Sequence, residues 1–253
     1  MLRSRIIPCL LIHNKGLVKT VKFKDHKYVG DPINAVKIFN EKEVDELIVL
    51  DIDATKENRG PNMKMIRNLA NECRMPLCYG GGINTIEQAV QIINLGVEKV
   101  ALSYSALQDL ELCQKIGDII GNQSVVVVID VKKKKLFGGY DIYTHNGTKK
   151  STWDLYDFVS KLEETGIGEI VINSIDNDGV MKGYDISLIE TIRGKCSMPI
   201  TVLGGAGNID DIKKIIKKFK IIGAAAGSLF VFKGKYKAVL INYPNREERK
   251  PVY

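Results

Sequence analysis

Short apolar runs alternate with amphipathic stretches along the whole chain. Eight runs are rich in Val, Ile and Leu, which is typical of parallel strands that are buried on both faces. They cover residues 6–12, 47–52, 76–79, 99–102, 125–131, 170–175, 200–203 and 221–226. Helical spacing of apolar residues marks the stretches 31–42, 62–73, 85–95, 152–165, 186–195 and 209–218. This alternation predicts an α/β protein with a parallel sheet.

The second half of the chain repeats the first half in register. The segment 74–82 returns 123 residues later as 197–205. The same offset relates Glu46 to Glu169 and Ser105 to Ser228. A long repeat of this kind indicates a duplicated supersecondary unit, because a solenoid has a much shorter period.

Four strand–helix units in each half predict a single (β/α)8 TIM barrel over 1–253. Its half-repeats are about 1–120 and 121–240, and 241–253 form a C-terminal tail. The alternative is an open doubly wound sheet, which does not explain a fourfold pattern that repeats in register.

Composition and charge narrow the classes of partner. The chain has 253 residues, of which 45% are hydrophobic, and this fits one soluble globular barrel. No apolar run approaches the roughly 20 residues of a membrane helix, and the N-terminus lacks the apolar segment of a signal peptide. We therefore expect a cytoplasmic protein without a membrane partner. The net charge of +7 is moderate, and its densest run, 132–135, lacks the interleaved aromatic residues of a nucleic-acid module, so a phosphorylated small molecule is the expected partner.

The cysteines predict neither a disulfide framework nor a zinc site. They are odd in number, scattered, and without a C-x-x-C pair: Cys9, Cys73, Cys78, Cys113 and Cys196. We expect reduced thiols, no metal ion and no cofactor.

Glycine-rich loops follow the third strand of each half. In a TIM barrel the chemistry lies at the carboxyl ends of the strands, where free backbone N–H groups near a helix start bind phosphate. Serines follow the fourth strand of each half in matching positions. The candidate phosphate ligands of these loops are Gly81, Gly82, Ser103, Ser105, Gly204, Gly205, Gly227 and Ser228. The alternative is that the glycines only make tight turns.

One carboxylate is expected at the mouth of the barrel. Asp130 ends the fifth strand, where it can act as a general acid or base. The alternatives are a strand-end cap or a salt bridge with Lys132. Alignment of the first strand with the fifth places Leu11 opposite Asp130, so one half offers a carboxylate and the other an apolar side chain.

Motifs over almost the whole chain match one known family. They are Arg5-Ile6-Ile7-Pro8-Cys9-Leu10, Val18-Lys19, Gly30-Asp31-Pro32, Asp45-Glu46-Leu47, Gly80-Gly81-Gly82-Ile83, 126–130, 174–179 and Gly204-Gly205-Ala206-Gly207. In these motifs the chain resembles HisF, the cyclase subunit of imidazole glycerol phosphate synthase. The resemblance implies a half-repeated barrel with a glutaminase subunit docked at its bottom face. Ammonia would cross the barrel to a bis-phosphorylated substrate at the top.

The resemblance also implies roles for individual residues. The charged ring that gates the ammonia entrance is matched by Arg5, Glu46, Lys99 and Glu169, and the acidic docking positions for the glutaminase by Asp45 and Glu98. The alternative for the ring is a purely structural layer of salt bridges at the barrel base. At the top, the catalytic positions are matched by Asp130, the loop lysine Lys19 and Asp178, and Gly179 joins the phosphate ligands.

The substrate end departs from the family pattern. The first of the two catalytic aspartates of HisF falls on Leu11, and an isobutyl group cannot transfer a proton. Further replacements lie in the upper loops, namely Ala101, Ser103, Tyr104, Asn173 and Leu203. Because the ammonia entrance is retained while the substrate end is changed, the pattern favours delivery of ammonia to a different acceptor.

The changed pattern resembles the HisF-like paralogues of bacterial surface-sugar pathways. That resemblance implies acetamidino-group formation on a nucleotide-linked sugar for lipopolysaccharide, with a HisH-like glutaminase and a third, amidotransferase-type protein as partners. Two alternatives stay open. The chain is either an authentic cyclase of histidine biosynthesis that tolerates Leu11, or a non-catalytic ammonia conduit.

Overall fold

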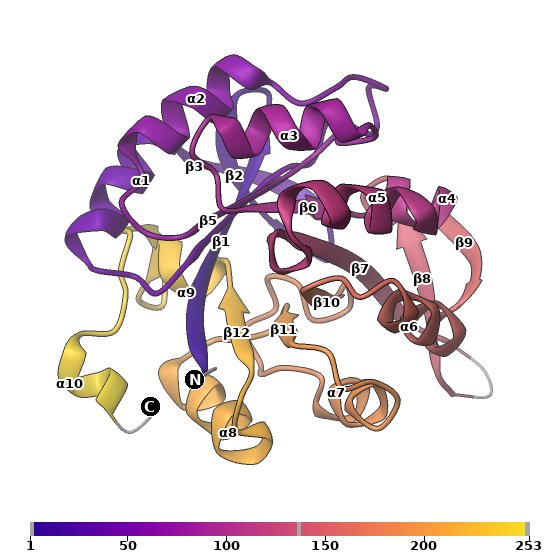
Figure 1. Ribbon diagram of the computed structural model, residues 1–253. Helices are drawn as coiled ribbons and strands as arrows, with labels where there is room; N and C mark the ends of the chain where they lie inside the picture. Colours follow the sequence, from indigo (N-terminus) through magenta and orange to yellow (C-terminus); the bar gives the residue numbers. More distant parts are fainter. Residues whose placement is uncertain (1–2, 136–137, 251–253) are drawn as a thin grey trace.

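Eight parallel strands close into a barrel in the computed structural model, which describes residues 3–135 and 138–250 (Figure 1). The strands are β1 (Arg5–His13), β4 (Leu47–Asp51), β5 (Leu77–Gly80), β6 (Lys99–Leu102), β7 (Val125–Lys133), β10 (Glu169–Ser174), β11 (Ile200–Leu203) and β12 (Gly223–Ala226). The pairing of β12 with β1 closes the ring, and β6–β7 and β7–β10 join the two halves. The predicted TIM barrel is confirmed. Residues 251–253 of the predicted tail lie outside the described residues.

Helices surround the barrel, and five of them begin within one residue of a predicted amphipathic stretch, whereas the helix over 110–120 was not predicted. The helices are α1 (Pro32–Glu41), α2 (Met63–Glu72), α3 (Ile86–Asn94), α5 (Leu110–Ile120), α6 (Leu155–Glu164), α7 (Ile186–Arg193) and α8 (Ile209–Phe219). The residue before each of these helices, for example Asp31 and Asn62, accepts a backbone N–H of the first turn and so caps it.

An antiparallel hairpin follows the first strand of each half, and sequence analysis did not predict either one. The hairpins are β2 (Gly16–Val21) with β3 (Lys24–Gly30), and β8 (Tyr140–Thr144) with β9 (Lys149–Asp154). The predicted helix start at 152 is therefore wrong. The β-branched and aromatic residues Thr152 and Trp153 belong to β9, and the helix begins at Leu155 because Asp154 caps it.

The last unit closes without a long helix in the described residues. After β12 come the short α9 (Ser228–Val231), the two-stranded β13 (Phe232–Lys233) and β14 (Ala238–Val239), and the short α10 (Arg246–Arg249), drawn in yellow in Figure 1. The Tyr243 hydroxyl donates to the Ile6 carbonyl at 2.8 Å, and Arg249 lies 3.5 Å from Asp45. The C-terminal segment thus packs against the amino end of β1.

Strand alternation divides the core into two layers. In β1, Ile6 and Leu10 point outward to the helices, whereas Ile7 and Cys9 point into the barrel. The interior is apolar along most of its length, and polar side chains gather at its two ends. Those two ends hold the residues that the sequence singled out.

Candidate functional site

Four charged side chains form a closed ring at the bottom of the barrel. Arg5, Lys99 and Glu169 begin their strands, and Glu46 directly precedes β4. Arg5 donates to Glu46, and also to Glu169 at 2.6 Å. Lys99 Nζ lies 2.8 Å from Glu46 and 3.0 Å from Glu169. Each cation therefore binds both carboxylates, and the structure brings all four predicted gate residues together.

The ring keeps its charges although it is largely buried. Burial alone would raise the pKa of Glu169, but Arg5, Lys99 and a hydrogen bond from the Thr201 hydroxyl outweigh it, so the pKa lies below its usual value. Burial opposes the charged form of Lys99, yet Glu169 and Glu46 raise its pKa. Two positive and two negative charges thus balance one another in direct contact, so the ring needs no counter-ion from solvent.

The two predicted docking residues lie in different environments. The Asp45 side chain is 5% exposed and accepts the Ile6 backbone N–H at 2.9 Å, while Arg249 of the C-terminal segment lies 3.5 Å away. Direct contact between Asp45 and a partner would require this segment to move. Glu98 is exposed, so it is accessible to a partner without any rearrangement.

A cavity of about 380 Å³ opens at the opposite end, among the carboxyl ends of the strands. Every predicted catalytic and phosphate-binding residue lines it: Lys19, Gly81, Gly82, Ser103, Ser105, Asp130, Asp178, Gly179, Gly204, Gly205, Gly227 and Ser228. The barrel topology accounts for this, because the loops after parallel strands converge at one end.

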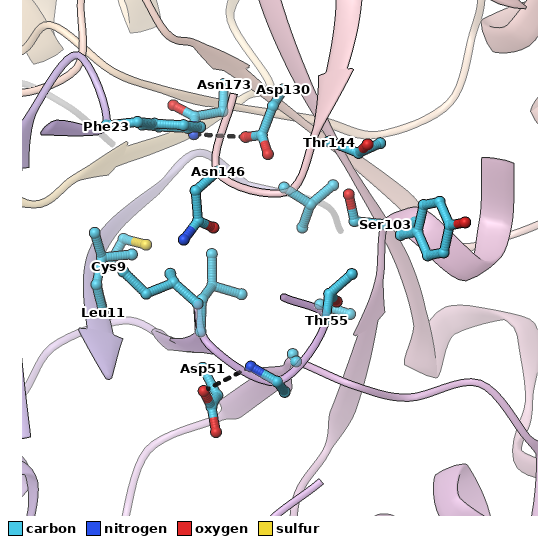
Figure 2. A pocket seen from close by; sticks show the side chains of 18 of the residues that line it. Cys9, Leu11, Phe23, Asp51, Thr55, Ser103, Asp130, Thr144, Asn146 and Asn173 are labelled. Carbon is cyan, nitrogen blue, oxygen red and sulfur yellow. Dashed lines mark hydrogen bonds between the residues drawn. The ribbon is translucent and has the colours of Figure 1, made fainter. Parts of the chain in front are cut away.

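Asp130 faces this cavity and has one hydrogen-bond partner among the described residues. Asn173 Nδ2 donates to Asp130 Oδ1 at 2.8 Å, as Figure 2 shows. Burial, with a further contribution from Asp178, raises the pKa of Asp130 to about 7, although the Asn173 hydrogen bond lowers it. Lys132 is not its partner, because that ammonium lies over the Tyr143 ring. The salt-bridge alternative for Asp130 is therefore not supported by this geometry.

The other half of the barrel places an apolar pair in the equivalent position. Leu11 of β1 pairs with Leu50 of β4, just as Asp130 of β7 pairs with Asn173 of β10. Both leucines pack against the apolar interior of the barrel. One side of the cavity floor is therefore polar and can exchange protons, and the other side is not.

The β2–β3 hairpin is fastened over the cavity by Asp178. The Asp178 carboxylate accepts the Thr20 hydroxyl at 2.6 Å and the Phe23 N–H at 3.2 Å, and its carbonyl accepts the Lys22 N–H at 2.9 Å. Burial raises the pKa of Asp178. The predicted catalytic position at Asp178 is thus engaged in holding the hairpin.

The same hairpin carries Lys19 into the cavity. The Lys19 side chain is buried, and its ammonium donates to the Cys9 carbonyl. Burial lowers the pKa of Lys19, although Cys9 and Asp178 oppose this effect.

Tight backbone packing explains several of the loop glycines. Gly81, Gly204 and Gly205 have positive φ, and a Cβ on any of them would approach a backbone oxygen to 2.7 Å or less. The tight-turn alternative therefore holds at these positions, whatever they bind. Gly227 differs, because its φ is −101° and a Cβ there would come close to the far end of Lys19, at 2.6 Å from Nζ, while the Cys9 carbonyl oxygen lies at an ordinary contact distance of 3.4 Å.

Two of the predicted anion-binding helix starts are already occupied. In α3 and α8 the side chains of Gln88 and Asp211 accept the backbone N–H groups of Asn84 and Gly207. These caps engage the N–H groups of Asn84 and Gly207, and anion binding by the backbone of Gly81, Gly82, Gly204 and Gly205 stays a prediction. The next helices along the chain, α4 (Tyr104–Gln108) and α9, begin at the cavity without a side-chain cap, so their first N–H groups are the better donors.

A scan against protein families matches residues 5–237 to the histidine biosynthesis protein family. The chain is 57% identical to a provisionally named imidazole glycerol phosphate synthase subunit hisF3 of Vibrio vulnificus, over 99% of this chain and 96% of that protein. The chain belongs to the HisF family. It is also 53% identical to a provisionally named subunit hisF2 of Pseudomonas aeruginosa, over 97% of both chains. The identity is 36% to the imidazole glycerol phosphate synthase subunit HisF of Natranaerobius thermophilus, over 96% of both chains.

This HisF-type subunit has further cavity residues that sequence analysis missed. The β8–β9 turn contributes His145 and Asn146, and the His145 ring meets Tyr104 edge-on at 4.8 Å between ring centres. Tyr104 and His145 thus form an aromatic part of the cavity wall. The Thr-His-Asn-Gly sequence before β9 is a turn signal that predicts this hairpin.

Metal-binding clusters and membrane-spanning helices are both absent from the described part of this HisF-type chain. Within residues 3–135 and 138–250, no group of three or more His, Cys, Asp or Glu side chains is arranged to hold a metal ion. No helix in those ranges has the length and apolar character that crossing a bilayer requires.

Proposed function

We propose that this chain carries ammonia from a HisH-like glutaminase through its barrel to a phosphorylated substrate in the upper cavity. The reaction is acetamidino-group formation on a nucleotide-linked sugar for a bacterial surface polysaccharide, with a third, amidotransferase-type protein taking part. The contrast between the two ends of the barrel carries this proposal. The charged ring at the bottom is complete, whereas the upper cavity sets Asp130 opposite Leu11.

The interior of the barrel supports passage of a neutral molecule. Above the ring it is lined by Ile7, Cys9, Ile48, Cys78, Val126, Val128, Val171 and Ala225. From Arg5 to Leu11 the first strand covers about 20 Å at roughly 3.3 Å per residue. Neutral ammonia crosses such a lining at little cost, but the ammonium ion would lose its hydration there. A gate that admits ammonia at the ring and keeps water out is consistent with this lining.

The upper end supports a reaction with a single proton-transfer group. A pKa of about 7 lets Asp130 exchange protons near neutral pH. Ammonia would attack the carbonyl carbon of the acetamido group with its lone pair while the C=O π electrons move onto oxygen. Asp130 would take the surplus proton from nitrogen and pass it to that oxygen, which would leave as water when the C=N bond of the amidine forms. Leu11 supplies an apolar wall and no second acid.

The loops around the cavity support a phosphorylated ligand with an attached ring. Gly227 and Ser228 begin α9 without a side-chain cap, and Lys19 brings a positive charge beside them. Tyr104 and His145 offer aromatic surface on the other side. A nucleotide sugar, whose diphosphate lies between the sugar and a nucleoside with a base to stack, matches these features.

Two alternatives make different demands on the same residues. An imidazole glycerol phosphate synthase cyclase, the activity named for the Natranaerobius relative, would have to work with Leu11 in place of an acid. A non-catalytic conduit would tolerate replacement of Asp130, because a third protein would perform the chemistry.

Nitrogen tracing tests the delivery of ammonia. The chain, its glutaminase and the acceptor protein are supplied with glutamine labelled with ¹⁵N in the amide group, and with unlabelled ammonium chloride in excess. We expect the amidine product to carry the label from glutamine. Product with the nitrogen of bulk ammonium would show that nothing passes through the barrel. Asp130→Asn then distinguishes two hypotheses. Product formation should be lost if this chain is the enzyme, and it should be retained if the chain is a non-catalytic conduit.

Calorimetry tests the substrate class. UDP-N-acetylglucosamine, a nucleotide-linked 2-acetamido sugar, should bind more tightly than the bis-phosphate substrate of the histidine pathway. Tighter binding of the bis-phosphate would favour the cyclase.

A further inference from the structure

Asn173 has an unpaired oxygen beside Asp130. The side chain is 5% exposed, and its Nδ2 donates to Asp130 Oδ1 at 2.8 Å. Its Oδ1 has no hydrogen-bond partner among the described residues. Buried amide oxygens are nearly always paired, and an exception in a cavity marks a place where a donor from a ligand belongs.

The surroundings leave this oxygen room for a ligand. A Cβ on Gly204 would lie 3.1 Å from Asn173 Oδ1, so the absence of a side chain at Gly204 keeps space beside the amide oxygen. Asn173, Asp130 and Gly204 all line the upper cavity. Figure 2 shows Asn173 and Asp130 together on one side of this cavity, away from Leu11.

When Asp130 is ionised, the two open oxygens of the pair, Asn173 Oδ1 and Asp130 Oδ2, are hydrogen-bond acceptors. Asp130 Oδ1 is taken by Asn173, and within residues 3–135 and 138–250 no group donates to Asp130 Oδ2. Asn173 Oδ1 and Asp130 Oδ2 together would bind a small group with at least two N–H bonds. A phosphate oxygen would be repelled here, so this corner is distinct from the glycine loops.

The position of Asn173 and Asp130 in the barrel indicates which N–H compound they bind. Asn173 and Asp130 follow Val171 and Val128, which face the apolar interior through which ammonia would arrive. In the other half, Leu11 and Leu50 occupy the equivalent positions and can accept no hydrogen bond. Nitrogen leaving the barrel therefore meets acceptors on one side only.

We propose that Asn173 Oδ1 and the Asp130 carboxylate form the ammonia-binding site at the upper exit of the barrel. This inference rests on the proposed function, because it assumes that ammonia reaches the upper cavity. Asn173 is in this view a residue that binds and orients the nitrogen, so that its lone pair faces the substrate and a proton faces Asp130.

A binding experiment tests the site without any product being formed. The protein is labelled with ¹³C at the aspartate Cγ, and the Asp130 signal, assigned with Asp130→Asn, is followed at pH 8.5 as ammonium chloride is added. We expect a saturable shift in the natural sequence and its loss in Asn173→Leu, which copies Leu50 of the other half. Tetramethylammonium chloride at equal ionic strength, which has no N–H, should leave the signal unchanged. An equal effect of both salts, or none from ammonium, would overturn the proposal.

Kinetics supply the second measurement and a folding safeguard. With ammonium as nitrogen source, Asn173→Leu should raise the KM for ammonium about tenfold, the factor that one hydrogen bond provides, and leave the KM for the phosphorylated substrate unchanged. Asn173→Thr keeps a hydroxyl acceptor and should restore most of the affinity if the leucine variant folds poorly. Equal changes in both KM values would mean that Asn173 only supports the cavity.

The two measurements also separate this site from the proposed function. A saturable ammonium shift without amidine product would leave the site standing and refute the reaction. Labelled amidine product without any ammonium shift would refute the site alone.

Discussion

Removal of the Lys99 charge should unbalance the ring at the bottom of the barrel. Lys99 Nζ lies 2.8 Å from Glu46 and 3.0 Å from Glu169, whose side chains are 5% and 6% exposed. Lys99→Met keeps the length of the side chain but leaves two buried carboxylates to share Arg5. Breaking a buried ion pair costs about 3–5 kcal/mol, and we expect the lower end because Lys99 is 19% exposed.

That loss translates into a melting temperature. For a chain of this size, about 3 kcal/mol lowers Tm by roughly 6–12 °C. Lys115→Met is the matched control, because Lys115 pairs with Glu111 on the exposed face of α5 and its removal should leave Tm unchanged. Glu46→Gln added to Lys99→Met should recover part of the lost stability, since it removes the one negative charge that Arg5 cannot balance.

The pH dependence gives an independent check. The pKa of Glu169 lies below its usual value in the folded chain, so its contribution to stability is present above the unfolded pKa of about 4.3 and is lost as the pH falls through the folded value. Without Lys99 the pKa of Glu169 should rise, so the difference in Tm between the two proteins should be widest at neutral pH and close towards pH 4. A gap that is independent of pH, or a Tm equal to that of Lys115→Met, would refute the reasoning.

The same variant tests the gate. Glutamine-supported product formation should fall more than formation supported by added ammonium salt, because only the former requires entry through the ring. Equal losses with both nitrogen sources would count against a gate.

Three further outcomes are expected. Histidine-pathway cyclase activity with ammonium salt should be absent and should appear only in Leu11→Asp, since general acid–base assistance is worth about 10²–10⁴ in rate; normal turnover in the unmodified chain would contradict this. Gly227→Ala should weaken binding of UDP-N-acetylglucosamine in calorimetry and leave Tm nearly unchanged, whereas Gly205→Ala should lower Tm, because its Cβ would lie 2.1 Å from the Gly183 carbonyl oxygen. Activity should rise with pH through about 7 as Asp130 becomes a base. Because the pKa of Asp130 is raised in the folded chain, its contribution to stability is lost as the pH rises through this value. Asp130→Asn should therefore raise Tm more at pH 8 than at pH 4, and equal changes in Tm would count against the raised pKa.

The architecture and the location of the sites could be predicted from the sequence. Each strand of a TIM barrel is buried on both faces, so its sequence is a nearly continuous apolar run that can be recognised without the structure. The duplication made these runs recognisable as two sets of four. Once the barrel was recognised, residues that begin strands had to lie at the bottom and residues that end strands at the top, which is why Arg5, Lys99 and Asp130 are where the sequence placed them.

The hairpins were missed for an equally physical reason. β9 is largely exposed, and β3 is exposed over most of its length, so neither carries an apolar run. The β2–β3 hairpin is held down by Asp178, which is 158 residues from Thr20 in the chain. No local pattern records a hydrogen bond of that separation.

Pairing across the barrel was also decided by the tertiary structure alone. The sequence contains Asp130 and Asn173, but only the register of β7 against β10 makes them partners and leaves Asn173 Oδ1 without a hydrogen-bond partner in the described part of the chain. Asp45 shows the same limit, because only the fold brings Arg249 to 3.5 Å from its carboxylate, and its docking role stays a prediction. Hydrophobic periodicity depends on neighbours along the chain, whereas the partners of a buried polar atom depend on which strands the closed barrel brings together.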